Sequence, residues 1–293
     1  MSFTKIKGPL FVFISALLFG SYGIWAVLLG SDFGPFFQGY VRSFLVLVVL
    51  VPFVLITKSW KPLSISDWKK YAWCISFAIF TQAPLYYAFQ NAGVGISSLI
   101  FFSVSLITSY IIGFTLLQEA LTKIKIISLS LALVGLALTF FSSLEIFSVM
   151  ALLLAAVNGI ASGGEVATTK LIPEKFSTIQ TSVIIWGAIF LTHLPLSFLF
   201  NEKQIMPALN IHWLAMLAFA LAGICAFWLV IEGFKYVDAS IGGLIGLLEI
   251  VFAIIFGVIV FNELVTIFII IGSLLIIFAA TLPYLLEIKN NTI

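Results

Sequence analysis

Residues 239–262 read ASIGGLIGLLEIVFAIIFGVIVFN, and this stretch establishes the class of the protein. Glu249 is its one charged residue. Because an α-helix rises about 1.5 Å per residue, such a run is long enough to cross the hydrocarbon core of a bilayer, which is roughly 30 Å thick. The stretch therefore predicts a membrane-spanning helix with Glu249 near its middle.

The rest of the 293-residue chain has the same character. Hydrophobic residues make up 62% of it, charged residues only 9%, and the mean hydropathy is +1.23. These values exclude a soluble globular domain, whose surface needs far more polar side chains. The pattern predicts an all-α integral membrane protein that crosses the lipid bilayer ten times. The ten predicted transmembrane helices cover 9–29, 35–56, 70–92, 94–118, 122–143, 146–169, 178–200, 212–235, 239–262 and 265–286.

The third and fourth predicted helices share one uncharged stretch. No charged residue occurs between Lys70 and Glu119, and this stretch is too long for a single crossing. The turn-forming residues within it are Asn91, Gly93 and Gly95. We therefore expect a tight hairpin at that point.

The lysines test this number of crossings, because basic residues concentrate in cytoplasmic loops. With a cytoplasmic N-terminus, ten crossings place every lysine except Lys203 on the cytoplasmic side. One crossing more or fewer in the middle of the chain would scramble this distribution. We therefore expect a multi-pass protein of the cytoplasmic (inner) membrane with both termini in the cytoplasm. The lysines on the cytoplasmic side are Lys5, Lys7, Lys58, Lys61, Lys69, Lys70, Lys123, Lys125, Lys170, Lys175, Lys235 and Lys289.

Several other classes of protein are disfavoured. The formal net charge is +2, but the lysines are dispersed along the chain, so no nucleic-acid-binding patch is expected. Both cysteines, Cys74 and Cys225, lie in apolar runs, which predicts neither a disulfide nor a metal site. We expect no cofactor, and the sequence contains neither H-E-x-x-H nor G-x-S-x-G.

The sequence repeats itself at an offset of about 144 residues. Glu119-Ala120-Leu121-Thr122 matches Glu263-Leu264-Val265-Thr266, and Gly20 matches Gly164. Five predicted helices per half is an odd number, so the second half must cross the membrane in the opposite sense to the first. Inverted repeats of this kind are common among secondary transporters. The two predicted five-helix repeats are residues 1–143 and residues 144–293.

With these residues in view, the chain resembles the EamA-type branch of the drug/metabolite transporter superfamily over nearly its whole length. The chain departs from the pattern where Ile250 replaces a common proline and where the first half has Ser103-Val104-Ser105. The resemblance implies a secondary transporter of small metabolites, often amino acids, with a central cavity and alternating access. The residues that carry it are Tyr86 to Gln90, Leu116 to Thr122, Leu248-Glu249 with Glu263, and Arg42 following Pro35.

Ionisable residues inside the apolar runs are the strongest functional signal, because each costs about 2.5 to 3.5 kcal/mol at a helix centre. Glu249 follows Gly242, Gly243 and Gly246, which allow local unwinding or close helix approach. We expect Glu249 to bind substrate or a proton. The alternative is a protonated carboxyl group that hydrogen-bonds to a neighbouring helix, with the glycines as a packing face.

Two further charged residues lie within predicted helices. Glu165 follows Asn158 in the sixth, where it either faces a cavity or reaches the lipid headgroups. Arg42 lies about 10 Å deep by helical rise, and it either binds a substrate carboxylate or pairs with a glutamate. We take Arg42, Glu165 and Asn158 as candidate binding residues and leave these alternatives open.

Aromatic side chains deep in the predicted helices complete the candidate site. An aromatic ring face attracts cationic groups, so a few of these rings are suited to hold a charged headgroup. Most other aromatic residues are expected to pack or to anchor the helices at the membrane interface. The aromatic candidates are Tyr22, Trp25, Tyr86, Trp186 and Trp228.

Other conspicuous residues have structural explanations. Glu119 and Glu263 stand at helix ends beside threonines that are able to cap the next helix, so we expect both to define the fold. Glu232 is expected to pair with Lys235 at helical spacing. His193 is expected to be a packing residue.

An arginine and two or more acids among aromatic rings suit a zwitterionic solute. We therefore predict a small-molecule substrate, an amino acid, and the surplus of acids favours a cationic one such as lysine or arginine. The same acids would alternatively bind protons for coupling, or the protein would work by exchange. Two other functions stay open: transport or export of another small metabolite or drug, and, from a different class, a membrane-embedded lipid-handling enzyme.

Overall fold

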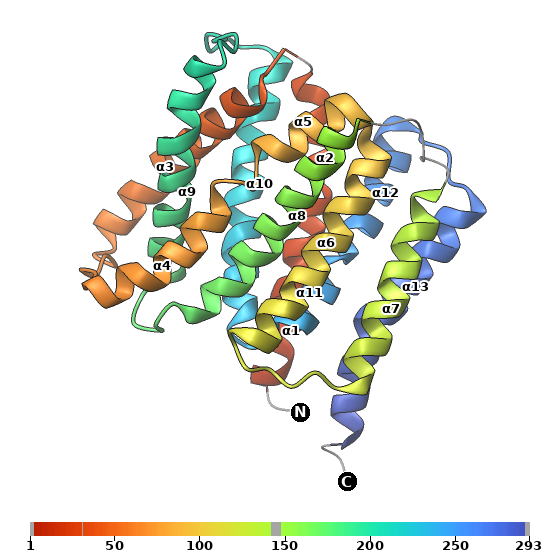
Figure 1. Cartoon of the computed structure of the whole chain (residues 1–293). Helices are drawn as coiled ribbons and strands as arrows, with labels where there is room; N and C mark the ends of the chain where they lie inside the picture. The colour runs from red at the N-terminus through yellow and green to blue at the C-terminus, as the bar shows by residue number, and fades with distance from the viewer. Residues whose placement is uncertain (1–2, 31, 142–147, 291–293) are drawn as a thin grey trace.

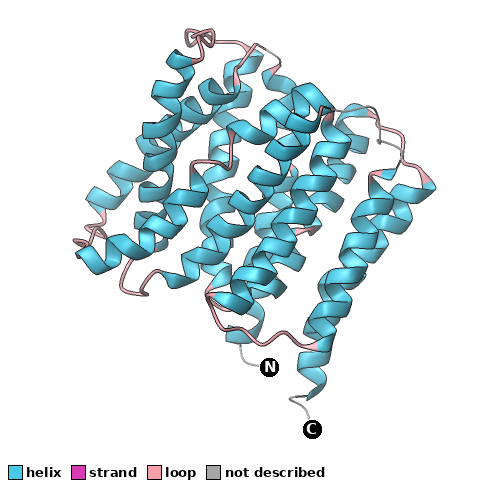
Figure 2. Cartoon of the chain, viewed as in Figure 1, coloured by secondary structure: helices cyan, strands magenta, loops and turns pink. Residues whose placement is uncertain are grey.

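The computed structural model describes residues 3–30, 32–141 and 148–290, and these residues form helices joined by short loops (Figures 1 and 2). The described residues include no strand, which confirms the predicted all-α class. The helices are α1 (Phe3–Gly20), α2 (Tyr22–Leu29), α3 (Pro35–Ile56), α4 (Ile65–Ala78), α5 (Ala83–Ala92), α6 (Val94–Thr115), α7 (Lys123–Thr139), α8 (Val149–Thr168), α9 (Thr178–Leu199), α10 (Ile211–Phe234), α11 (Ala239–Gly246), α12 (Leu248–Phe261) and α13 (Ile267–Asn290).

Seven helical segments of the described chain are long and apolar enough to cross a membrane, and Ile267–Pro283 is a shorter apolar helix. Two of the ten predicted spans, 70–92 and 122–143, are not among them. The first is divided between α4 and α5, because the chain leaves helical geometry at residues 79–82. The second contains α7, which has only 17 residues. The protein is therefore a multi-pass membrane protein, and the described residues do not show all ten predicted spans.

The predicted boundaries hold at several points. Helix α3 begins at Pro35, whose fixed φ suits a helix N-terminus, and it ends at Ile56, as predicted. The expected hairpin consists of a single residue, since α5 ends at Ala92 and α6 begins at Val94. Gly93 between them has φ +78°, a backbone conformation that glycine adopts without steric cost.

The two halves of the sequence interleave in space. The most extensive packing joins α1 with α10, α3 with α9, α6 with α8 and α7 with α13, so each pair combines one helix from each half. Figure 1 shows α7 and α13 side by side along one edge of the bundle. The halves therefore share one core and do not form separate bodies.

Glycines at corresponding positions of the two halves bring helices into close contact. A Cβ atom at Gly20 of α1 would lie 2.9 Å from the carbonyl oxygen of Glu249 and 2.6 Å from Cβ of Phe252, both in α12. In the other half, a Cβ atom at Gly163 of α8 would lie 3.1 Å from Cβ of Thr108 in α6. By these contacts the counterpart of Gly20 is Gly163, one position before the Gly164 that the sequence match indicated.

The bundle has two ends with different polar contacts. Figure 1 shows α1 beginning and α13 ending at the same end, which we call the termini face. The other end, where loops join α2 to α3, α9 to α10 and α12 to α13, is the opposite face. At the opposite face Lys203 lies 3.7 Å from Asp32, and both side chains are exposed. The ion pairs of the termini face are Lys7–Glu232, Lys125–Asp238, Lys170–Glu119, Lys175–Asp67 and Lys235–Glu232.

One of these pairs also caps a helix. The Ser64 hydroxyl accepts from the amide of Asp67, and the Asp67 carboxylate accepts from the amide of Ser64, which is a capping box at the start of α4. Lys175 donates to the same carboxylate at 2.8 Å. The hydrogen bond from Lys175, followed by those from Ser64, lowers the pKa of Asp67 to about 2.

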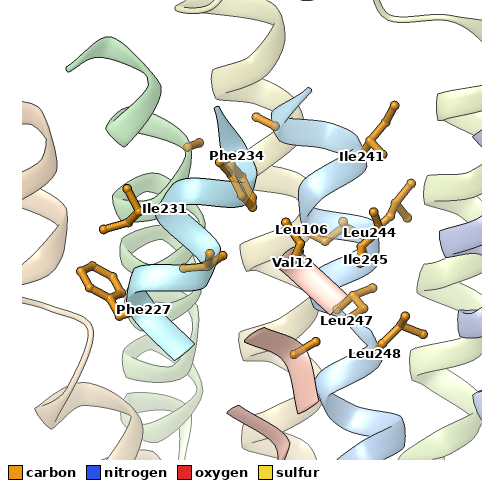
Figure 3. Packing of buried hydrophobic residues seen from close by; sticks show 14 of the residues in the cluster. Val12, Leu106, Phe227, Ile231, Phe234, Ile241, Leu244, Ile245, Leu247 and Leu248 are labelled. Atoms are coloured by element: carbon orange, nitrogen blue, oxygen red, sulfur yellow. The ribbon is translucent and has the colours of Figure 1, made fainter. Parts of the chain in front are cut away.

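A buried apolar cluster fills the bundle toward the termini face. Figure 3 shows Val12 of α1, Leu106 of α6 and Phe234 of α10 gathered around α11. These side chains are at most 3% exposed. The cluster closes this end of the space that lies between the helices.

Candidate functional site

A cavity of about 380 Å³ lies inside the bundle, walled by residues of α1, α2, α3, α5, α6, α8, α9, α10, α11 and α12. Toward the termini face it ends at Leu106 and Phe234, which are 2% and 3% exposed. Toward the opposite face it extends to Val94, the first residue of α6, which is 62% exposed. The cavity is therefore closed at the termini face and reaches the surface at the opposite face.

Seven of the nine predicted site residues line this one cavity. They come from helices of both halves: Tyr22, Arg42, Tyr86, Asn158, Glu165, Trp186 and Glu249. The charged side chains that were visible in the sequence as isolated interruptions of apolar runs therefore converge in space.

The other two predicted residues lie elsewhere. Trp25 donates from Nε1 to the Ser21 hydroxyl at 3.1 Å and packs with a separate apolar cluster near Leu29. Trp228 is 36% exposed, and its ring centroid lies 6.0 Å from that of Phe11. Neither lines the cavity, because both point away from it on helices whose other faces do line it.

Arg42 is held by aromatic rings and not by an acid. Its guanidinium carbon lies 4.1 Å from the ring centroid of Phe219, 5.4 Å from that of Tyr22 and 5.5 Å from that of Trp186. The side chain is 3% exposed, and its Nη1 donates to the Tyr86 hydroxyl at 3.4 Å, a long hydrogen bond. Cation–π contacts favour the charge, but they leave most of its hydrogen-bond donors unpaired.

The two cavity carboxylates are also unpaired. Among the described residues, the ion pairs within 4.0 Å include neither Glu165, Glu249 nor Arg42. Glu165 is 6% exposed, and Glu249 lies directly after the interruption between α11 and α12 at Leu247. Helix α11 carries the three glycines before it, and of the two roles expected for them, close approach or local unwinding, an interruption is present at the single residue Leu247. Charged residues without partners inside apolar helices are costly and mark binding sites more often than packing.

Asn158 has a positioning role in this geometry. Its amide nitrogen donates to the carbonyl oxygen of Phe80 at 2.9 Å, and its amide oxygen accepts from the Ser162 hydroxyl at 3.4 Å. These contacts join α8 to the break between α4 and α5. Asn158 is fully buried, so it orders the cavity wall near Glu165.

Two donors at the cavity have no partner among the described residues. They are Arg42 Nε and Trp186 Nε1. Trp186 is 4% exposed and packs edge-on against Phe227, with 5.8 Å between ring centroids. Buried donors in native proteins are almost always satisfied, so two neighbouring exceptions call for an acceptor that the chain does not supply.

The polar face of α6 was not predicted from the sequence. Ser98, Ser105 and Ser109 line the cavity together with Phe102. Their spacing of three, four or seven residues places them on one helical face, which is a detectable signal. It was missed because serine is common in transmembrane helices, where its hydroxyl bonds to the preceding turn, as Ser109 does to the carbonyl of Ser105 at 3.1 Å.

The remaining conspicuous residues lie as expected, with one exception. Glu232 pairs with Lys235 at 2.7 Å, and His193 is fully buried against the backbone of α3 at Gly39. The Glu119 side chain is nearly buried and fixes the start of α11. Glu263 is the exception, because it is exposed.

Comparisons with known proteins identify a matching family and a similar solved structure. The family model of the EamA-like transporter family matches the chain twice, over residues 6–141 and residues 149–285. A solved structure described as "Crystal structure of protein" has 18% sequence identity and a TM-score of 0.80, over 96% of this chain and 98% of that chain. At this identity the similarity shows the fold alone. No curated protein matches the sequence. Since the family model covers nearly the whole chain, the protein belongs to the EamA-like transporter family, a family of membrane transporters of small molecules.

Proposed function

We propose that this protein is a secondary transporter that moves amino acids across the cytoplasmic membrane by alternating access. One observation carries the proposal: Arg42, Glu165 and Glu249 face the same cavity, and none of them has an ion-pair partner within the described residues. A zwitterionic solute would supply the missing partners for all of these groups. Its carboxylate would bind at Arg42, and its ammonium group at Glu165 or Glu249.

The proposed substrate class follows from the charged and polar side chains that line the cavity. Two acids against one arginine favour an amino acid with a second positive charge, such as lysine or arginine. Arg42 is the only cationic side chain among the described residues that line the cavity, which disfavours phosphorylated substrates. The unpaired Nε1 of Trp186, beside Arg42, provides a second donor for the substrate carboxylate.

Alternating access requires two related halves, and the packing supports inverted repeats of five crossings each, residues 1–143 and residues 144–293. In this proposal α1 with α2, α4 with α5, and α11 with α12 each form one interrupted crossing, which brings the total to ten. The contact of α1 with α12 corresponds to that of α8 with α6, as the paired Gly20 and Gly163 contacts require.

The orientation follows from the lysines. The ion pairs of the termini face contain five lysines from separate parts of the chain: Lys7, Lys125, Lys170, Lys175 and Lys235. Because cytoplasmic loops are rich in lysine and arginine, we assign the termini face to the cytoplasm. The cavity then reaches the surface on the outer side.

Counterflow in proteoliposomes tests the proposal. Vesicles preloaded with an unlabelled amino acid should accumulate the labelled one, and Glu249→Gln should reduce the initial rate for lysine roughly tenfold or more, since a hydrogen bond to a charged group contributes about 1.5 to 3 kcal/mol. Asp32→Asn is the matched control, because it removes a carboxylate at the exposed surface. If Glu249→Gln leaves both the rate and its pH dependence unchanged, the assignment of Glu249 is wrong.

The same vesicles separate the alternatives. Coupling to protons predicts that an imposed pH gradient drives uptake and that a glutamine at position 165 or 249 abolishes the effect of the gradient. A channel would show no saturation and no exchange. A lipid-handling enzyme would alter added lipid without moving solute; among the described residues no group of three or more histidine, cysteine or acidic side chains is arranged to hold a metal ion for such chemistry.

A further inference from the structure

Helices α6 and α12 end in the same turn. Gln118 and Asn262, which correspond to each other in the repeat, both adopt left-handed backbone, with φ +56° and +55°. Residues other than glycine rarely do so. The amide of the next residue, Glu119 or Glu263, then donates to the carbonyl of a glycine in the preceding helix, Gly113 or Gly257, at 2.8 Å and 3.3 Å. The chain therefore presents a glutamate in matched geometry at two ends of the molecule.

The two glutamates differ in what they contact. Both carboxylate oxygens of Glu119 accept from the amide of Ala239, the first residue of α11, at 2.9 and 2.8 Å. Lys170 donates to the same carboxylate at 2.6 Å and to the carbonyl of Val237 at 2.6 Å. Glu119 thus joins the end of α6 to the start of α11 and to Lys170, which follows α8, at the closed end of the cavity. Glu263 is exposed at the open end, and its carboxylate lies over Gly257 as that of Glu119 lies over Gly113. No ion pair within 4.0 Å among the described residues includes it.

The repeat identifies the missing contact of Glu263. By the offset that relates Glu119 to Glu263, Ala239 corresponds to Gly95 in the first turn of α6. The first amides of a helix have no partner within it, and they attract a carboxylate. Val94 and Gly95 lie at the open end of the cavity, where Val94 is one of its lining residues.

We propose that Glu119 and Glu263 are matched latches that close opposite ends of the cavity in turn. In the conformation closed at the opposite face, the Glu263 carboxylate accepts the first amides of α6, as Glu119 here accepts that of α11. This inference rests on the alternating access proposed above, and it assigns the residues that hold each closed state.

The two latches differ in their ion pairs, and this difference determines which conformation is favoured without substrate. By the register of Gly20 and Gly163, the counterpart of Lys170 is Val27, which is 61% exposed and carries no charge. The pair Lys125–Asp238, also at the termini face, would correspond to Ile269 and Val94. The latch at the termini face therefore has two ion pairs that the other lacks, and the conformation closed at that face is favoured without substrate.

Thiol labelling from the opposite face tests this. Gly23 lines the cavity and has no atom within 4 Å of an added Cβ, so Gly23→Cys is a tolerated reporter. In a chain with Cys74→Ala and Cys225→Ala, a membrane-impermeant maleimide should label it readily. Lys170→Met should slow labelling by up to about fivefold, because loss of a cap or ion pair costs on the order of 1 kcal/mol and shifts the equilibrium toward the conformation closed at the opposite face by that factor. Glu263→Gln added to Lys170→Met should restore the rate.

The controls separate a latch from a general loss of structure. Lys175→Met breaks an ion pair of the same face that does not join α6 to α11, and it should leave the rate within about twofold, as expected of a surface pair. Glu119→Gln should reproduce the effect of Lys170→Met. The proposal is overturned if Lys170→Met and Glu119→Gln leave labelling unchanged, or if Glu263→Gln fails to restore it. Labelling needs no substrate, so a failed amino acid assignment leaves this result readable.

Discussion

The two halves of the chain build similar helices but contribute opposite charges to the cavity. The first half supplies Arg42, and the second half supplies Glu165 and Glu249. In the register of the repeat, Arg42 corresponds to Trp186, which packs 5.5 Å from it, and Glu249 corresponds to Ser105, which lines the same cavity. Two halves with related backbones can therefore form a cavity whose two sides carry opposite charges. A substrate with charged ends would bind in one orientation only.

Arg42→Gln should have the largest effect on this division of charge. It removes the only cation among the described cavity residues, and loss of one partner of a buried charged contact costs about 2 to 5 kcal/mol. We expect amino acid counterflow to fall by roughly a hundredfold or more. Trp186→Phe, at the corresponding position, should lose far less. Equal losses would contradict the assignment of the carboxylate to Arg42.

Gly163→Ala and Gly20→Ala test whether corresponding contacts of the two halves are equally tight. An added Cβ at Gly163 would lie 3.1 Å from Cβ of Thr108, and one at Gly20 would lie 2.6 Å from Cβ of Phe252. Each substitution should destabilise the protein by about 1 to 3 kcal/mol, as overpacking does. Thermal unfolding in detergent measures this. Gly187→Ala, with nothing within 4 Å of the added carbon, should not destabilise it.

The smallest predicted effect concerns the caps of two corresponding helices. Helix α4 begins with the titratable pair of Ser64 and Asp67, whereas α10 begins with Asn210, which accepts from the amide of Trp213 at 3.0 Å. Because its folded pKa is about 2 and its ordinary value 3.8, Asp67 stabilises the folded state above about pH 4. This stabilisation is lost as pH falls toward 2.

Thermal midpoints across this pH range check the prediction. The midpoint of the parent protein should exceed that of Asp67→Asn near pH 6, and the difference should vanish near pH 2. Asn210→Ala, which removes a neutral cap, should lower the midpoint by a similar amount at every pH. A difference between parent and Asp67→Asn that persists at low pH would show that the cap does not depend on the charge.

Much of the fold can be predicted because hydrophobic length and charge placement determine it locally. Helix α3 matches its predicted bounds, Pro35 to Ile56, and the hairpin falls at Gly93 as expected. The interruption at Leu247 follows three glycines, whereas the interruption at Ser21 is different. No proline marks Ser21, and it lies where α1 and α12 approach each other at Gly20. Such a break depends on contacts between distant segments, which the local pattern does not contain.

Some residues of the candidate site can likewise be predicted from the sequence, and others cannot. Arg42, Glu165 and Glu249 stand out because a charge in an apolar run is costly wherever the helix faces. Trp25 and Trp228 do not line the cavity, because an aromatic residue is stable on any face of a membrane helix. The serines of α6 went unnoticed for the same reason. The sequence thus identifies the residues whose burial needs an explanation, and the neighbouring helices decide the rest.

In the proposed function, the cavity binds the carboxylate of the substrate at one end and its ammonium group at the other. Inhibition of lysine counterflow by two analogues distinguishes the ends: 1,5-diaminopentane lacks the carboxylate, and 6-aminohexanoic acid lacks the α-amine. Each analogue should inhibit roughly tenfold more weakly than lysine, since each leaves a buried charged group unpaired. In Arg42→Gln, removal of the carboxylate should no longer matter. Equal inhibition by lysine and both analogues in the parent protein would show that the cavity does not recognise the two charged ends.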